Sequence, residues 1–277
     1  MRGVLQKSAS IYTPLGRLNP DGDEQHVVFQ TYLPPDELTP FVDHFWTIAW
    51  NRSADEPYVS EQVMHRPYVD VFLSEQQSGI QCTFRDKRDY TAVDKGRIIG
   101  ARLHPGAFHA FWGGSMDGLH NGTIPLQDVF AAADPAFIAH VLTLGDDEGV
   151  TVLAELIEAN HPQMDPNIEV INNIIAAIER EDLQTVKEVA QWSGRSERWL
   201  QQLFQSYVGI GVKWQLQRNK LLAAARSIRD SDAHDWADLA YSHGYSSQQH
   251  FITDFKRVTG RTPLQYKKAL DADRQTD

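Results

Sequence analysis

Cysteine is almost missing from this chain of 277 residues, which has Cys82 as its single copy. One cysteine excludes a disulfide framework and a cysteine-rich zinc site within the chain. A reducing compartment fits this composition, so we expect a cytoplasmic protein. We expect Cys82 itself to be a small buried apolar residue.

Long apolar runs are missing as well. No run of 18 apolar residues occurs, which predicts that no helix spans a membrane. The first ten residues include Arg2 and Lys7 but no apolar segment of the kind found in a signal peptide, so we expect none.

The familiar catalytic and metal-binding motifs are also missing. The sequence has no Gly-x-Ser-x-Gly and no phosphate-binding glycine loop. It lacks the His-x-His with a following carboxylate of a metal-binding cupin, and His104 and His109 have neither helix nor strand spacing. We therefore expect no enzymatic activity, no cofactor and no metal site.

The formal net charge is -11, which looks unsuited to a nucleic-acid binder, but the acidic residues are unevenly distributed. Residues 1–165 contain 11 basic and 23 acidic residues, whereas residues 166–277 contain 15 and 14. Only the C-terminal part can therefore present a locally basic face to phosphates. The acidic N-terminal part argues against a membrane-surface role.

Residues 27–124 are dominated by short strand patterns separated by turn residues. The expected strands are Val27–Leu33, Phe45–Trp50, Val69–Leu73, Ile80–Phe84 and Arg97–Leu103, with a short helix over Asp36–His44. Many short strands with little helix predict a barrel or a sandwich. The dense aromatic residues of this stretch are typical of a core, and an interior large enough for a small effector is the alternative.

Helical spacing begins near Pro125 and continues to the end of the chain. Helices are expected over Leu126–Ala133, Pro135–Leu144 and Glu148–Asn160, followed by a linker with two prolines, His161–Pro166. We therefore predict an α+β chain with a mainly β domain at 1–162, helical over 125–160, and an all-α domain at 163–277. The helices of 125–160 either pack on their own domain or form a homodimer.

Two stretches of the C-terminal part repeat one pattern. An alanine and a glycine recur at an offset of 50, and later positions recur at 51, which places one extra residue in the second turn. The pairs are Ala190 and Ala240, Gly194 and Gly244, Leu200 and Phe251, Phe204 and Phe255, and Gly209 and Gly260. Small residues allow two helices to cross closely, and a glycine reverses the chain after a helix. This layout predicts two helix-turn-helix units.

Local capping signals support these units. Thr185 with Glu188 forms a capping-box pattern, and Ser196 and Ser246 or Ser247 are suited to cap the second helices. The face opposite the apolar pairs is polar, and Arg and Gln can bind guanine and adenine edges in the major groove. The polar residues are Arg198, Gln201, Gln202 and Gln205, then Gln248, Gln249, His250 and Thr253.

The segment Asn167–Lys268 resembles the DNA-binding domain of the AraC/XylS family of bacterial regulators. The motifs that carry the resemblance are Thr185–Ala190, Ser196–Phe204 and, most specifically, Gly244–Tyr266. The resemblance implies two subdomains joined by a long helix, Val212–Ile228, with reading helices in successive major grooves. Gln202 and Thr253 depart from the family, which often has arginine at both positions.

Residue roles follow from the resemblance by position. The implied base-reading residues are Arg198, Gln201, Gln202, Gln248, Gln249, His250 and Thr253. The expected phosphate contacts are Lys187, Arg195, Ser196, Ser247, Lys256, Arg257 and Arg261. Double-stranded DNA is the expected partner and RNA polymerase is a further candidate. Activator is one expected role, and repressor stays open as the alternative.

The family usually places a sensing or dimerising domain, often a cupin-type β-barrel, before the reading units. Arg97–Phe108 resembles a segment in a subset of such regulators. A small-molecule effector is therefore expected in this domain, near His65, Arg66, Tyr68, Arg102, His104 and Trp112. Two other classes stay open: an enzyme fused to a DNA-binding tail, and a helical interaction module without DNA binding.

Overall fold

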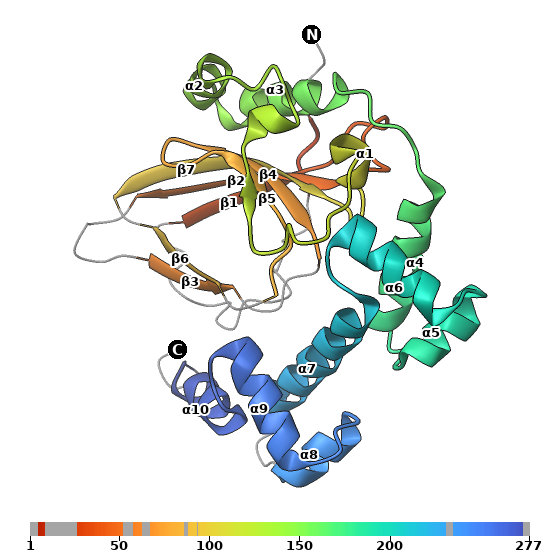
Figure 1. Cartoon of the computed structure of the whole chain (residues 1–277). Coiled ribbons are helices and arrows are strands. Elements are labelled where there is room, and N and C mark those ends of the chain that lie inside the picture. The colour runs from red at the N-terminus through yellow and green to blue at the C-terminus, as the bar shows by residue number, and fades with distance from the viewer. Residues whose placement is uncertain are drawn as a thin grey trace.

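The computed structural model describes residues 5–8, 27–51, 58–62, 67–85, 88–92, 94–230 and 235–273. An N-terminal sheet domain is followed by a C-terminal helical domain, and the two meet at one end of the sheet (Figure 1). Within the described ranges, no helix is long and apolar enough to cross a membrane.

The sheet domain is built on a six-stranded antiparallel sheet. Its order is β1 (Val27–Tyr32), β2 (Val42–Asn51), β7 (Lys95–Leu103), β4 (Val69–Ser74), β5 (Gly79–Gln81) and β8 (Thr123–Ile124). A separate pair consists of β3 (Tyr58–Gln62) and β6 (Arg88–Ala92). This pair lies across from one face of the large sheet (Figure 1).

The expected cupin-type barrel is not confirmed, because the large sheet is open. β1 and β8 are its two edges, and β3 and β6 pair with each other as a second sheet. The sequence pattern could not decide this point, since alternating short strands fit an open two-sheet arrangement as well as a closed one.

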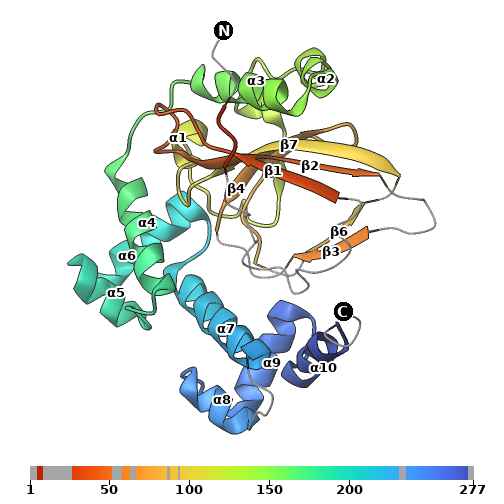
Figure 2. The ribbon, with the colours of Figure 1, turned by 180° about the vertical axis from the view of Figure 1, so that it is seen from behind.

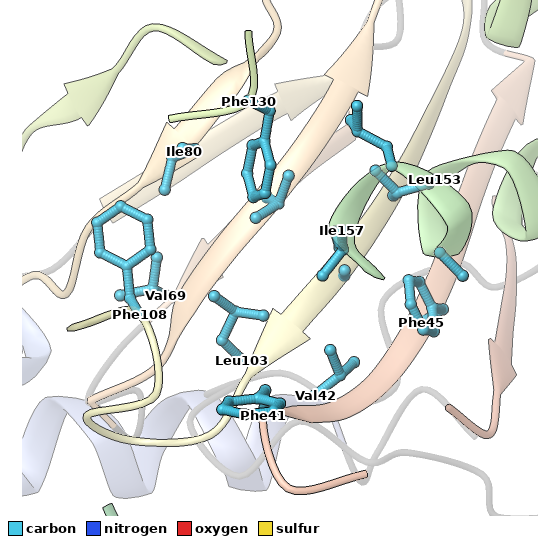
Figure 3. Close-up of a cluster of buried hydrophobic side chains, with 14 of the residues drawn as sticks. Phe41, Val42, Phe45, Val69, Ile80, Leu103, Phe108, Phe130, Leu153 and Ile157 are labelled. Carbon is cyan, nitrogen blue, oxygen red and sulfur yellow. The ribbon is translucent and has the colours of Figure 1, made fainter. Parts of the chain in front are cut away.

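Helices cover the other face of the large sheet (Figure 2). They are α2 (Pro135–Thr143) and α3 (Asp146–Glu158), while the short α1 (His109–Trp112) lies at the end of the sheet nearest the helical domain. Figure 3 shows the apolar core between the large sheet and these helices, in which Phe45 and Leu103 from the sheet face Leu153 and Ile157 from α3. Gly149 allows close packing, since a Cβ there would come 2.6 Å from Ile99 Cδ1.

Two expected helices of this domain were wrong. Asp36–His44 forms a turn over residues 36–41 and then enters β2, because prolines at 34, 35 and 40 leave room for one turn only. Leu126–Ala133 contains only a short 3₁₀ helix, η2 (Leu126–Asp128). The pattern also missed β3, β6, β8 and α1.

The helical domain follows its expected layout. Its helices are α4 (Pro166–Glu179), α5 (Val186–Ser193), α6 (Glu197–Val208), α7 (Val212–Asp230), α8 (Trp236–Ser242), α9 (Gln248–Thr259) and α10 (Pro263–Asp273). We call α5 and α6 the first unit and α8 and α9 the second unit. They lie toward opposite ends of the long α7 (Figure 1), and each has its own apolar core.

Candidate nucleic-acid interface

The first unit has helix-turn-helix geometry that its local sequence explains. Thr185 caps α5, with a full capping box to Glu188, and Gly194 ends the helix in the left-handed region at φ 66°. Ser196 then caps α6 by accepting from the Trp199 amide at 3.2 Å. Leu200 and Phe204 are both fully buried, so the opposite side of α6 faces outward.

The second unit repeats this geometry. Asp235 caps α8 through its carboxylate, and Gly244 takes φ 73° in the turn. Ser247, rather than Ser246, caps α9 by accepting from the His250 amide at 3.2 Å. Phe251 and Phe255 are fully buried and stack edge to face at 5.5 Å. The turn from Gly244 to Ser247 is one residue longer than that from Gly194 to Ser196, which explains the slip in the repeat.

The predicted base-reading side chains all lie on the outward sides of α6 and α9. Every one of the seven is exposed: Arg198, Gln201, Gln202, Gln248, Gln249, His250 and Thr253. The four glutamines take part in no side-chain hydrogen bond within the described ranges. Thr253 Oγ1 donates to the Gln249 carbonyl at 2.8 Å, and His250 Nε2 lies 3.5 Å from Asp254. The two helices thus present amide groups that no protein partner satisfies.

The predicted phosphate-binding residues flank these faces. Lys187, Arg195, Lys256 and Arg257 are exposed, and Arg261 is half-buried. The Arg195 guanidinium lies 4.9 Å from the centre of the Trp199 ring, a contact that the sequence analysis missed. Arg257 lies 3.3 Å from Asp254, whereas Lys256 forms no ion pair in the described structure. Ser196 and Ser247 serve as helix caps, which leaves a hydroxyl at each helix N-terminus.

A carboxylate stabilises the start of the first unit. Glu188 accepts from the backbone N–H groups of Gln184 at 2.7 Å and of Thr185 at 3.1 Å. These donors lower the pKa of Glu188 below its ordinary value. The Glu188 carboxylate is therefore charged at neutral pH, the form that accepts these two hydrogen bonds.

The sheet domain brings together only some of the predicted effector residues. Arg102 donates twice to Asp70, at 2.7 Å each, and its guanidinium lies 5.1 Å from the Tyr68 ring centre. His104 Nδ1 lies 3.6 Å from Asp43. Burial would raise the pKa of Asp43, but the hydrogen bond with His44 and nearby positive charge outweigh it and lower that pKa.

The structure does not place the other predicted effector residues beside Arg102 and Tyr68. Trp112 stacks on Phe108, with ring centres 6.2 Å apart, and packs against the helix-covered core. His65 and Arg66 lie outside the described residues.

The sequence analysis missed an aromatic surface next to Arg102, on the face of the sheet that α3 does not cover. Trp46 pairs with Gly100 across strands and Trp50 pairs with Gly96. A Cβ on either glycine would come within 2.4 Å of the facing indole ring, so both rings lie flat on the sheet. The strand period of two could have indicated this, since Trp46 and Trp50 share a face and Gly96 and Gly100 are four residues apart.

Comparisons with known proteins divide the chain in the same way. Residues 189–269 match the model of a helix-turn-helix domain, and residues 30–125 match a domain of unknown function (DUF6597). The regulatory protein SoxS of Escherichia coli is 32% identical over 104 residues, which cover 37% of this chain and 96% of SoxS. A putative AraC-like transcription regulator of Streptomyces lividans is 36% identical over 84 residues, 30% of this chain and 27% of that protein.

One solved structure is similar to part of the chain. A transcriptional regulator of Chromobacterium violaceum with an AraC-type DNA-binding domain covers 38% of this chain and 92% of its own length, at 22% identity and a TM-score of 0.32. The 104 residues matched to SoxS span nearly its whole length. The chain therefore belongs to the AraC family of DNA-binding transcription regulators.

Proposed function

We propose that α6 and α9 enter the major groove of double-stranded DNA and read its bases. The observation that carries this proposal is the repeated row of exposed polar side chains on both helices, in which the four glutamines form no side-chain hydrogen bond within the described ranges. At an offset of 51, Arg198 corresponds to Gln249 and Gln202 to Thr253. The seven proposed base-reading residues are Arg198, Gln201, Gln202, Gln248, Gln249, His250 and Thr253. Lys187, Arg195, Ser196, Ser247, Lys256, Arg257 and Arg261 are the proposed phosphate contacts.

The test compares duplex DNA enriched from a random pool by the wild-type chain with scrambled DNA. Gln249→Ala should reduce the discrimination between them by roughly 1–3 kcal/mol, the value of one bidentate base contact. Gln127→Ala, a glutamine exposed on the sheet domain, is the matched control and should change nothing. Equal weakening of Gln249→Ala on both DNAs would remove its base-reading role.

We further propose that the sheet domain, residues 1–162, binds a small-molecule effector on the aromatic surface of Trp46 and Trp50. The Trp46 indole N–H is buried and has no hydrogen-bond partner within the described ranges. Arg102, Asp70 and Tyr68 form a polar group on the same side of the sheet. A largely apolar, flat molecule with a hydrogen-bond acceptor suits this combination.

Thermal unfolding against a panel of such molecules tests the effector proposal. A binder should raise the melting temperature of the wild-type chain, and Trp46→Leu should abolish that rise. Trp192→Leu, at an exposed tryptophan of α5, is the control. A rise that survives Trp46→Leu would place the ligand elsewhere, and no rise with any molecule would count against effector binding.

The remaining proposals follow from family membership. The chain acts in the cytoplasm by binding rather than by catalysis, activates transcription and contacts RNA polymerase. Homodimer formation through α2 and α3 is tested by light scattering across protein concentration. A monomer at every concentration would remove the dimer and leave DNA binding intact, because one chain holds two reading units.

A further inference from the structure

The C-terminal end of α6 is held by the sheet domain. The Met116 amide donates to the Ser206 carbonyl at 2.8 Å, and Arg85 Nη2 donates to the Gly209 carbonyl at 3.4 Å. Gly209 ends α6 at φ 76°, and a Cβ there would come 2.7 Å from the Met116 carbonyl oxygen. The sheet domain thus supplies a donor and a cation to the negative end of this helix dipole.

Side chains extend this contact. The His109 ring stacks on Tyr207, with ring centres 3.9 Å apart and an interplanar angle of 16°. Tyr207 also donates to Asp165, and Asn172 Nδ2 donates to the Pro105 carbonyl at 3.1 Å. The segment that follows β7, residues 104–122, therefore docks on both α4 and α6.

One hydrogen bond of this contact lies on the face of α6 that we propose to meet DNA. Gln205 lies three and four residues after Gln202 and Gln201, so it continues their row along the helix. Its Nε2 donates to the Asp117 carboxylate of the sheet domain. At the offset of 51, Gln205 corresponds to Lys256, the exposed cation that we propose to contact a phosphate.

We propose that Asp117 is a built-in competitor of the DNA phosphate at the first unit. Its carboxylate binds Gln205, the counterpart of a phosphate-binding residue, and it is exposed beside the reading row. A carboxylate at this place repels the phosphate backbone, so binding of DNA by α6 requires that the Asp117–Gln205 bond break. This inference rests on the proposed reading role of α6.

The competitor acts on one unit only. The contacts described above all lie on α4 or α6, and Asp117 meets the first unit through Gln205. Binding of α6 to DNA therefore requires that residues 104–122 shift. This segment begins after Leu103, the residue that follows Arg102 in β7, which connects it to the proposed effector surface.

The decisive experiment measures the affinity of full-length variants for the enriched duplex by fluorescence anisotropy at low and at physiological salt. Asp117→Ala should bind roughly two- to fivefold more tightly at low salt, the scale of one exposed charge pair, and the gain should shrink with salt. Asp128→Ala removes an exposed acidic residue of the same domain that does not contact α6, and it should give a smaller gain.

A double-variant cycle separates the bond from the charge. In a Gln205→Ala background, Asp117→Ala should give a smaller gain than in the wild-type background, because only the charge of Asp117 is left to remove. Equal gains for Asp117→Ala and Asp128→Ala in the wild-type background would overturn the competitor. If the wild-type chain selects no sequence at all, the proposed DNA reading fails instead, so the two failures are distinguishable.

Discussion

The two helix-turn-helix units share one local design and differ in what surrounds them. Both have a capped second helix, a left-handed glycine in the turn and a buried i,i+4 pair. The first unit is joined to the sheet domain, since Tyr207 packs against the cores of both. The second unit has a separate core with Phe251, Phe255 and the last part of α7. Equivalent substitutions should therefore have different consequences in the two units.

The largest difference should come from the equivalent core residues Phe204 and Phe255. Phe255→Ala should cost about 3–5 kcal/mol, as for other buried aromatic residues, and should unfold the second unit alone. Phe204→Ala has a similar local cost, but the sheet domain should keep the first unit partly ordered. Hydrogen exchange of α6 and α9 amides measures both effects. Equal loss of exchange protection in the two units would show that the sheet domain does not stabilise the first unit more than the second.

The equivalent caps should give a smaller contrast. Ser247→Ala and Ser196→Ala each remove one side-chain cap, at a cost of roughly 1 kcal/mol. Because the sheet domain holds the end of α6, Ser196→Ala should fray only the start of that helix, whereas Ser247→Ala should loosen most of α9. Amide hydrogen exchange in α6 and in α9 measures both effects. A greater loss of protection in α6 than in α9 would contradict this expectation.

Lys256 and Gln205 should differ in their salt dependence. Lys256→Ala should lower the slope of log affinity against log salt by about one phosphate contact. Gln205→Ala removes no charge, so its slope should match that of the wild-type chain. Affinities across a salt series give both slopes, and an unchanged slope for Lys256→Ala would remove its phosphate role.

The smallest expected effect is a pH response of the second unit alone. Burial lowers the pKa of His243, while Glu181 opposes and Arg226 adds to this shift. His243 Nε2 lies 3.1 Å from Ser227 Oγ. Because the folded pKa is depressed, the unfolded unit takes up the proton first. Stability is therefore complete above the ordinary value of about 6.5 and decreases as pH falls through the folded pKa.

Amide hydrogen exchange tests this response at about pH 7.5 and about pH 5.5, on either side of the ordinary histidine pKa. The rates are corrected for the pH dependence of intrinsic amide exchange. The α8 and α9 amides should lose protection at the lower pH, and the α6 amides should not. His243→Gln should remove the response. The equivalent residue of the first unit, at an offset of 50, is Ser193, which cannot titrate in this range.

Sequence reasoning worked best where structure is local. The capping box of Thr185 and Glu188, the left-handed glycines and the second helix of each unit were all confirmed, because each depends on neighbours within about five residues. The barrel was not confirmed, because strand closure depends on pairing between residues far apart in the chain. The helices expected over 36–44 and 126–133 were wrong, because prolines or pairing with distant strands determine the structure there.

The sequence by itself determined the two units and the polar rows on their second helices, since helix periodicity and capping are short-range physics. The family followed from matches to known sequences. Only the tertiary structure decided that Trp46 and Trp50 lie flat on paired glycines and that Asp117 meets Gln205. Residues 117 and 205 are 88 apart. No local pattern indicates which distant segment will reach a helix, because that contact is set by how the two domains pack.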